Sequence, residues 1–150
     1  MTENSLVIFT KASQMLAEAD TIQKTKELKD LALTAADWAK RKGMGDEAIR
    51  YANSYALAAE RKMGELIAEG QEAGIVATKG RPDKYTQVVY LKELGLSLKD
   101  SSNAQQLAEL PEEIFEEVRE GKKTRAKAKK EIRNKATSNI NNHITIKRRN

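Results

Sequence analysis

Apolar residues recur every three or four positions through two consecutive segments of this chain, residues 22–42 and 46–72. This spacing lines one face of an α-helix, whereas a half-buried strand needs strict alternation. Gly43 separates the two segments and can adopt the left-handed backbone that ends a helix. The sequence therefore predicts that the two segments form an antiparallel helical hairpin.

Alanine predominates on both stripes, and small side chains let two helix backbones approach closely. We expect a third helix over residues 5–19, with Asp20 or Thr21 capping the helix after it. This unit can fold alone or pair with a second copy, and we expect a homodimer because such stripes bury little apolar area. The expected buried side chains are Leu28, Leu31, Ala32, Ala35, Trp38 and Ala39 in one arm and Ala48, Ala52, Ala56, Ala59, Met63, Leu66 and Ile67 in the other.

Composition favours an all-α fold, because 33% of the residues are charged, only 5% are aromatic and there are just 2 prolines. The chain has 0 cysteines and a single histidine, His143, so we expect no metal centre. No nucleophile stands beside a base and no glycine-rich phosphate loop follows a strand, so we expect neither an enzyme nor a cofactor. No segment has the roughly 20 apolar residues that span a bilayer, and the segment MTENSLVIFTK has too short an apolar run for a signal peptide, so we expect a cytoplasmic protein.

Positive charge is concentrated in the second half of the chain. Residues 1–75 contain 10 Lys/Arg and 12 Asp/Glu, residues 76–135 contain 14 and 10, and residues 136–150 contain 3 and 0. A basic half is typical of nucleic-acid binders, because neutralising phosphates releases counterions, although a solvated surface has the same composition.

The breaks in periodicity divide the chain into four parts. Residues 1–73 form the alanine-rich hairpin region, and residues 74–84 form a basic linker rich in Gly and Pro. Lys79 and Arg81 of this linker are expected to contact DNA along the phosphate backbone or in the minor groove, although an ordinary solvated linker has the same composition. Residues 85–135 form a second helical module. Residues 136–150 have too few periodic apolar residues to fold alone, which predicts a disordered basic tail.

The second module has the order of a helix-turn-helix, with a short apolar helix, a turn at Gly95 and a polar helix over Leu98–Leu110. Asn and Gln can pair with adenine in the major groove, while Ser and Lys bind phosphates. The expected DNA-contacting residues of this helix are Lys99, Ser101, Ser102, Asn103, Gln105 and Gln106. Cations that follow it are expected to bind phosphates, namely Lys122, Lys123, Arg125, Lys127 and Lys129.

The sequence LKELGLS, the polar helix and then LAELPEEIFEEVREGKKTRAKAKKEI resemble the helix-turn-helix region of ParB-type partition proteins, over residues 85–132. The segment ERKMGEL, residues 60–66, is similar to one in small phage and mobile-element proteins that join an alanine-rich helical region to such a module. The nucleotide-binding domain of the partition family has no counterpart here. The resemblance implies a helix-turn-helix that binds DNA without the partition enzyme.

These observations predict a non-enzymatic protein that binds double-stranded DNA sequence-specifically, as a regulator or accessory factor of a phage or mobile element. The alternative is a helical adaptor or inhibitor that grips a host or phage protein through the alanine-rich hairpin. Binding to random duplex DNA at low and moderate salt distinguishes the two.

Overall fold

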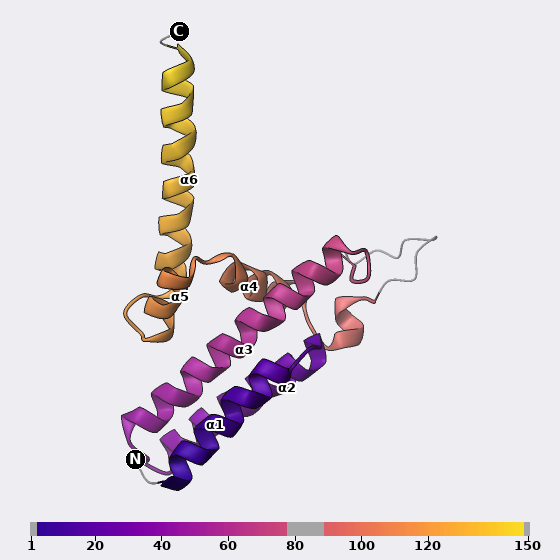
Figure 1. Cartoon of the computed structure of the whole chain (residues 1–150), viewed down its shortest axis with the longest axis vertical. Helices are drawn as coiled ribbons and strands as arrows, with labels where there is room; N and C mark the ends of the chain where they lie inside the picture. Colours follow the sequence, from indigo (N-terminus) through magenta and orange to yellow (C-terminus); the bar gives the residue numbers. More distant parts are fainter. Residues whose placement is uncertain (1–2, 78–88, 149–150) are drawn as a thin grey trace. The chain divides into compact units, whose positions relative to one another are not determined.

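The computed structural model describes the backbone of residues 3–77 and 89–148, and the side chains of residues 11–77 and 89–138. Within these residues the regular structure is helical, as the composition predicts, apart from one isolated bridge (Figure 1). Six α-helices and one 3₁₀ helix follow in order: α1 (Glu3–Glu18), α2 (Ile22–Arg41), α3 (Asp46–Glu72), η1 (Leu91–Leu94), α4 (Leu98–Glu109), α5 (Glu112–Arg119) and α6 (Arg125–Arg148). The contacts divide the chain into two compact units, residues 1–108 and 109–150.

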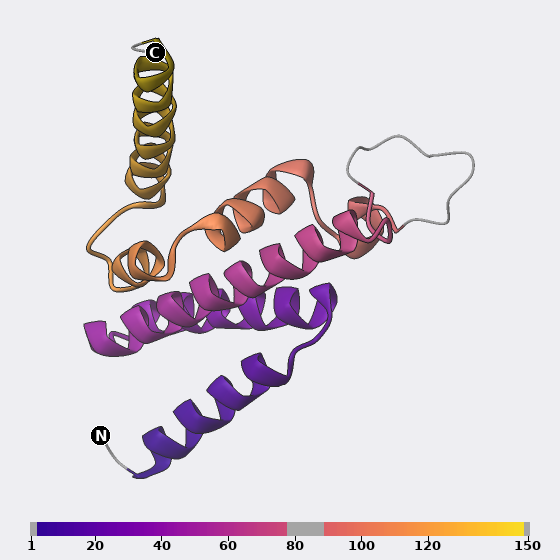
Figure 2. The ribbon, with the colours of Figure 1, turned by 45° about the horizontal axis from the view of Figure 1, so that its top comes forward.

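Helices α2 and α3 pack against each other and run side by side (Figures 1 and 2). Thr21 caps α2, because its Oγ1 accepts a hydrogen bond of 3.1 Å from the Lys24 amide. Gly43 ends the same helix with a φ of +68°, as the sequence predicts. Local signals therefore set both ends of the first arm.

The buried face of α2 is narrower than the spacing of its apolar residues predicts. Thr25, Ala32, Ala36 and Ala39 are its buried residues. Leu31 and Trp38, which we expected in the core, are 64% and 56% exposed. The three- and four-residue spacing of apolar residues fits two neighbouring faces of this alanine-rich helix. Helix α3 packs against the face with the smaller side chains, because small residues let the two helices approach closely.

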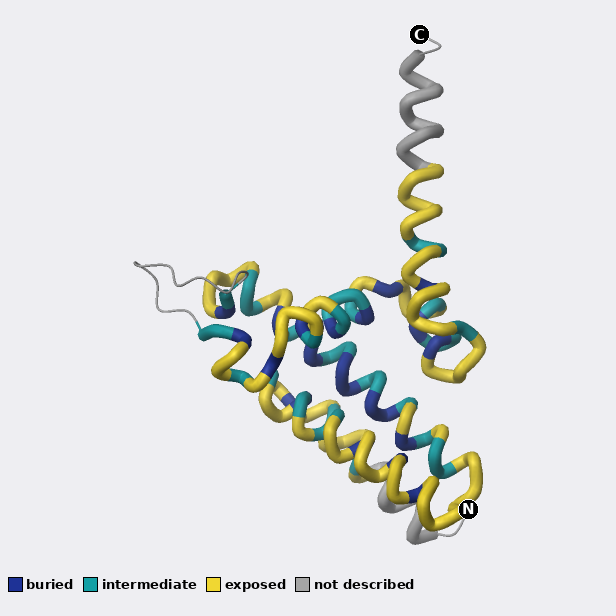
Figure 3. Tube along the Cα trace, turned by 180° about the vertical axis from the view of Figure 1, so that it is seen from behind, coloured by how far each residue is buried: buried dark blue, intermediate teal, exposed yellow. Residues whose placement is uncertain are grey.

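The principal core of the first unit joins α3 to the chain that follows it. Met63, Ile67, Val76, Leu91, Leu96 and Ala104 form one buried cluster, with Ile22 and Leu94 packed against it. The darkest segments of α3 in Figure 3 mark this buried side. Residues 91–104 therefore share a core with α3, and the division between the two contact units falls after residue 108.

Val76 and Val89, which lie on either side of residues 78–88 in the sequence, are paired in a parallel β-bridge. The Ala77 amide donates to the Val89 carbonyl at 3.0 Å, and the Val89 amide donates to the Ile75 carbonyl at 2.8 Å. Where the sequence predicts an apolar helix ending at Gly95, the structure has this bridge and then η1, one 3₁₀ turn. Extended Val89 and the four-residue turn leave no room for an α-helix before Gly95, whose φ is +75°.

The second unit consists of α5, a turn and α6. Phe115 and Val118 of α5 and Ala128 of α6 are buried in it. Gly121 turns the chain with a φ of +80°, and Thr124 caps α6 by accepting from the Lys127 amide at 3.2 Å. The backbone stays helical to Arg148, whereas the sequence predicts a disordered tail over residues 136–150. Neither Gly nor Pro interrupts these residues, so nothing in the local sequence ends α6 earlier.

Candidate nucleic-acid interface

The start of α4 is fixed by a reciprocal pair of hydrogen bonds. The Ser97 amide donates to Asp100 Oδ2 at 2.9 Å, and the Asp100 amide donates to Ser97 Oγ at 3.0 Å. This is the geometry of a capping box, in which two otherwise unsatisfied amides of the first turn find partners. The bonds from Ser97 hold the pKa of the Asp100 carboxyl below its ordinary value. The expected start of this helix near Ser97 is confirmed.

One small-residue contact sets the depth at which α4 packs on α3. A Cβ added to Gly64 would lie 2.0 Å from the carbonyl oxygen of Ala104 and 2.8 Å from the Gln105 amide nitrogen. Ala104 is fully buried and Leu107 is 2% exposed. The inward face of α4 is therefore small at Ala104, where the two backbones meet, while Leu107 fills the space one turn further along.

The opposite side of α4 is polar and open to solvent. Lys99 and Ser102 are exposed, and Asn103 and Gln106 are half-buried. At 100° per residue these four positions fall on one side of the helix, opposite Ala104. Four of the six residues expected to contact DNA thus share one accessible face.

Ser101 and Gln105, the other two expected contacts, belong to the flank of the packed face. Ser101 is only 4% exposed, so its predicted exposure is wrong. Its Oγ accepts a hydrogen bond of 2.9 Å from Gln105 Nε2. Ser101 lies one turn before Ala104 and so falls on the side of α4 that packs toward α3. Leu98, at the start of the helix, is 63% exposed.

The segment Glu60–Leu66 positions α4 and α1 from within α3. Glu60, 4% exposed, forms an ion pair with Lys29 of α2, with Nζ 3.1 Å from Oε1. Lys62 donates to the carbonyls of Leu16 and Ala17 at the end of α1, the latter at 2.9 Å. These roles are structural, and sequence reasoning missed them. The available signal was Gly64, because a glycine inside a long helix costs about 1 kcal/mol and needs a packing reason.

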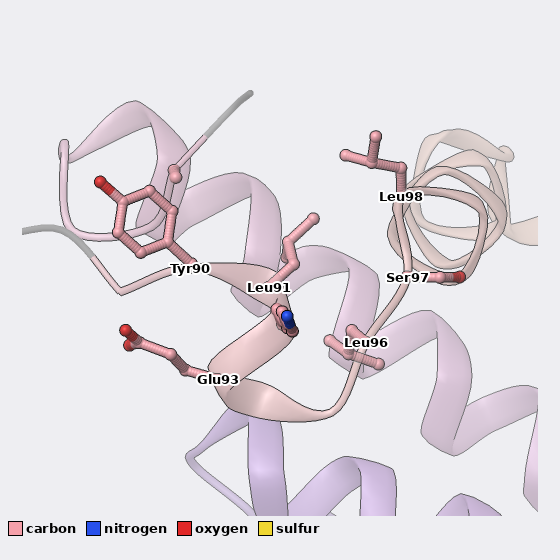
Figure 4. A pocket seen from close by; sticks show the side chains of 8 residues that line it. Tyr90, Leu91, Glu93, Leu96, Ser97 and Leu98 are labelled. Atoms are coloured by element: carbon pink, nitrogen blue, oxygen red, sulfur yellow. The ribbon is translucent and has the colours of Figure 1, made fainter. Parts of the chain in front are cut away.

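A pocket of about 460 Å³ lies beside the start of α4 (Figure 4). Its walls include Tyr90, Leu91, Leu96 and Leu98, with Glu93 and Ser97 at its edge. The residues that line it are mostly apolar. Its chemistry is that of an apolar contact surface next to the polar face of α4.

Two of the cations expected to bind phosphate are paired with carboxylates of the second unit. Lys123 Nζ lies 2.7 Å from carboxylate oxygens of both Glu117 and Glu131. Lys122 Nζ lies 2.9 Å from Glu120 Oε2. Hydrogen bonds to Glu117 and then Glu131 raise the pKa of Lys123, as the bond to Glu120 does for Lys122. Lys123 links α5 to α6 through these two ion pairs, so its ammonium group is less available to bind a phosphate.

The remaining predicted cations of this unit lie on α6. Arg125, Lys127 and Lys129 are all exposed, and the described side chains of this helix are mostly exposed (Figure 3). The whole of α6 contains eight Lys/Arg and one Glu. Lys79 and Arg81 lie outside the described residues.

Within the described parts of the chain, no three His, Cys, Asp or Glu side chains are grouped in a way that could hold a metal ion. None of the helices described has both the length and the apolar content needed to cross a membrane. Comparison with known protein families, curated proteins and solved structures found no match to the chain.

Proposed function

We propose that the chain is a non-enzymatic protein that binds double-stranded DNA and reads its sequence with the exposed face of α4. The observation that carries the proposal is the docking of α4 on α3 by its small residues, which leaves Lys99, Ser102, Asn103 and Gln106 together on the open side. Asn and Gln amides match the donor and acceptor of adenine in the major groove, while Lys and Ser suit phosphates. An α-helix fits that groove.

Two further features support this assignment. The capping box and the contact at Gly64 hold α4 rigidly, and a reading helix needs a fixed orientation on the duplex. Leu98 gives the start of the helix an exposed apolar side chain, of the kind that packs against the methyl group of thymine. The reading element proposed is narrower than a helix-turn-helix, because one 3₁₀ turn stands in the place of its first helix.

We assign to α6 the part of the DNA affinity that does not depend on base sequence. Its exposed Arg125, Lys127 and Lys129 are suited to phosphate oxygens, and each phosphate neutralised by such a cation releases a bound counterion. Lys122 and Lys123 are left out of this set because carboxylates already pair with them. The role proposed for the whole protein is that of a regulator or accessory factor acting at DNA sites.

The test is a fluorescence-anisotropy titration of the full chain against a random duplex and against a duplex selected from a random pool by the same chain. We expect binding to both that weakens steeply between low and moderate salt, and tighter binding to the selected duplex. The double variant Asn103→Ala, Gln106→Ala is expected to reduce the preference for the selected duplex by at least about tenfold while keeping the weaker binding.

The matched control replaces the same residue types elsewhere, at exposed Gln23 of α2 and Asn53 of α3. This control variant should retain the preference of the parent chain. An unchanged preference in the α4 variant removes the assignment of α4. No binding at either salt concentration removes DNA altogether and favours the adaptor that grips a protein through the hairpin.

A further inference from the structure

An apolar groove of about 480 Å³ runs between α1, α2 and α3, on the hairpin. Alanines form much of its floor, including Ala12, Ala35 and Ala48. Four large side chains stand in its walls with much of their surface exposed: Met15 (54%), Leu31 (64%), Trp38 (56%) and Met44 (45%).

The groove is more than a chance opening, because it gathers most of the large hydrophobic side chains exposed among the described residues. Seven such side chains are exposed, and four of them line this one groove. Contiguous exposed apolar surface on a folded protein marks an interaction site, whereas single exposed leucines need no explanation. An interaction site at this place needs an apolar partner.

The order of residues along α2 points to a second copy of the same helix. Leu31 and Trp38 are symmetric about the midpoint between residues 34 and 35, and so are Glu27 and Lys42. If two α2 helices cross antiparallel about that midpoint, Leu31 of each copy meets Trp38 of the other. The same register places Glu27 of each copy opposite Lys42 of the other, so apolar and charged pairs match together.

The positions needed for this pairing are accessible and lie on one side of α2. At 100° per residue, positions 27, 31, 38 and 42 fall within one quarter of the helix circumference, away from buried Ala36. Glu27 and Lys42 are both exposed. A surface that carries large side chains beside an alanine floor is self-complementary, as the shared interface of a twofold dimer must be.

We propose that the groove is the interface of a symmetric homodimer, in which Trp38 of each copy enters the groove of the other beside Leu31 and the Glu27–Lys42 pairs fix the antiparallel register. The contact covers the exposed apolar side chains of both copies at once. It makes no use of the polar face of α4, so the homodimer stands or falls independently of DNA binding.

The test is sedimentation equilibrium of the full chain, without DNA, over a wide range of protein concentration. We expect the mass to rise toward that of two copies, and Trp38→Glu or Leu31→Glu to weaken dimerisation at least about tenfold. The matched control is Leu33→Glu, because Leu33 is also exposed on α2 (43%) but does not line the groove. Far-UV circular dichroism of each variant verifies that its helices are retained.

The charges provide a second measurement that does not alter the apolar surface. Glu27→Lys and Lys42→Glu should each weaken the dimer by placing like charges opposite one another, and the double variant Glu27→Lys, Lys42→Glu should restore it. A parent chain that stays monomeric at every concentration overturns the proposal. It is equally overturned if Leu33→Glu disrupts the dimer as strongly as Trp38→Glu, or if the double charge variant fails to recover.

Discussion

Gly64 of α3 and Ala104 of α4 meet so closely that a Cβ on residue 64 would lie 2.0 Å from the Ala104 carbonyl oxygen. The neighbouring carbonyl carbon and the Gln105 amide nitrogen would lie 2.3 and 2.8 Å away. All three atoms belong to the backbone, so no change of side-chain rotamer relieves the overlap. This pair therefore makes the position of the proposed reading helix sensitive to a single methyl group.

Gly64→Ala should destabilise the chain by about 2 kcal/mol or more, even though alanine favours a helix by about 1 kcal/mol over glycine, because overpacking displaces α4. Urea unfolding followed by circular dichroism measures this loss. Gly70→Ala is the matched control in the same helix, since its Cβ would meet the side chain of Val76 instead of backbone. An equal or smaller loss at Gly64 than at Gly70 contradicts the packing described.

Replacing Glu60 alone should be costly, because Lys29 keeps its charge where only 19% of its side chain is exposed. We expect Glu60→Gln to lower the free energy of unfolding by about 2 to 4 kcal/mol, less than for a fully buried pair since Lys29 retains some solvent. The double variant Lys29→Met, Glu60→Leu should be more stable than Glu60→Gln in the same denaturation experiment. If the double variant is the less stable, the ion pair is not what makes Glu60 costly to replace.

Helix α1 depends on polar contacts from α3. Tyr55 Oη donates to the Ala12 carbonyl at 2.6 Å, and Lys62 reaches the carbonyls of Leu16 and Ala17. Tyr55→Phe should cost about 1 kcal/mol and Lys62→Met a similar amount, because each removes hydrogen bonds to backbone carbonyls. Hydrogen exchange should accelerate in α1 and stay unchanged in the centre of α3. Uniform acceleration of both helices would mean that α1 does not open separately.

The capping box gives the chain a dependence on acid. Because the folded pKa of Asp100 lies below its ordinary value of 3.8, its contribution to stability is complete above that pH and is lost as the pH falls through the folded pKa. Asp100→Asn should flatten the fall in unfolding free energy as the pH drops below about 4. Ser97→Ala should flatten it partly, since the Ser97 amide remains as a donor. A variant Asp100→Asn with the full acid dependence of the parent contradicts this assignment.

Lys123 and Lys129 should separate stability from DNA affinity. Lys123→Gln removes the cation between Glu117 and Glu131 and should lower stability, with little change in the salt dependence of DNA binding. Lys129→Gln should leave stability unchanged and reduce the slope of log affinity against log salt by about 0.9. Titrations at several salt concentrations, with denaturation in parallel, measure both quantities. The reverse pattern would reassign the two lysines.

Local signals were sufficient to predict most helix ends. Thr21, Gly43, Ser97 and Thr124 act within one turn of their own position, so the sequence alone reveals them. The prediction of an α-helix that ends at Gly95 was wrong. Val89 is paired with Val76 in a β-bridge, and only one 3₁₀ turn separates it from Gly95. Sequence spacing carries no information about such a partner.

Burial was harder to predict than helix position. Spacing placed Leu31 and Trp38 in the core and Ser101 on the surface, and the structure reverses all three. In each case the face that a helix buries depends on how closely a neighbouring helix can approach it. That approach depends on small residues of the neighbouring helix, such as Gly64 of α3, which the spacing within one helix does not reveal. Of the α4 residues expected to contact DNA, Lys99, Ser102, Asn103 and Gln106 keep that role in the proposed function.

The bridge between Val76 and Val89 makes the fold tolerant of changes in chain length between them. The backbone hydrogen bonds of the bridge join the two ends of that connection to each other, so the place where η1 and α4 begin is set by the bridge. Doubling the length of a loop costs in general only about 0.6 kcal/mol in closure entropy. Peptide tags or labels should therefore be accepted between residues 78 and 88, and evolution could lengthen or shorten this connection without rebuilding the core.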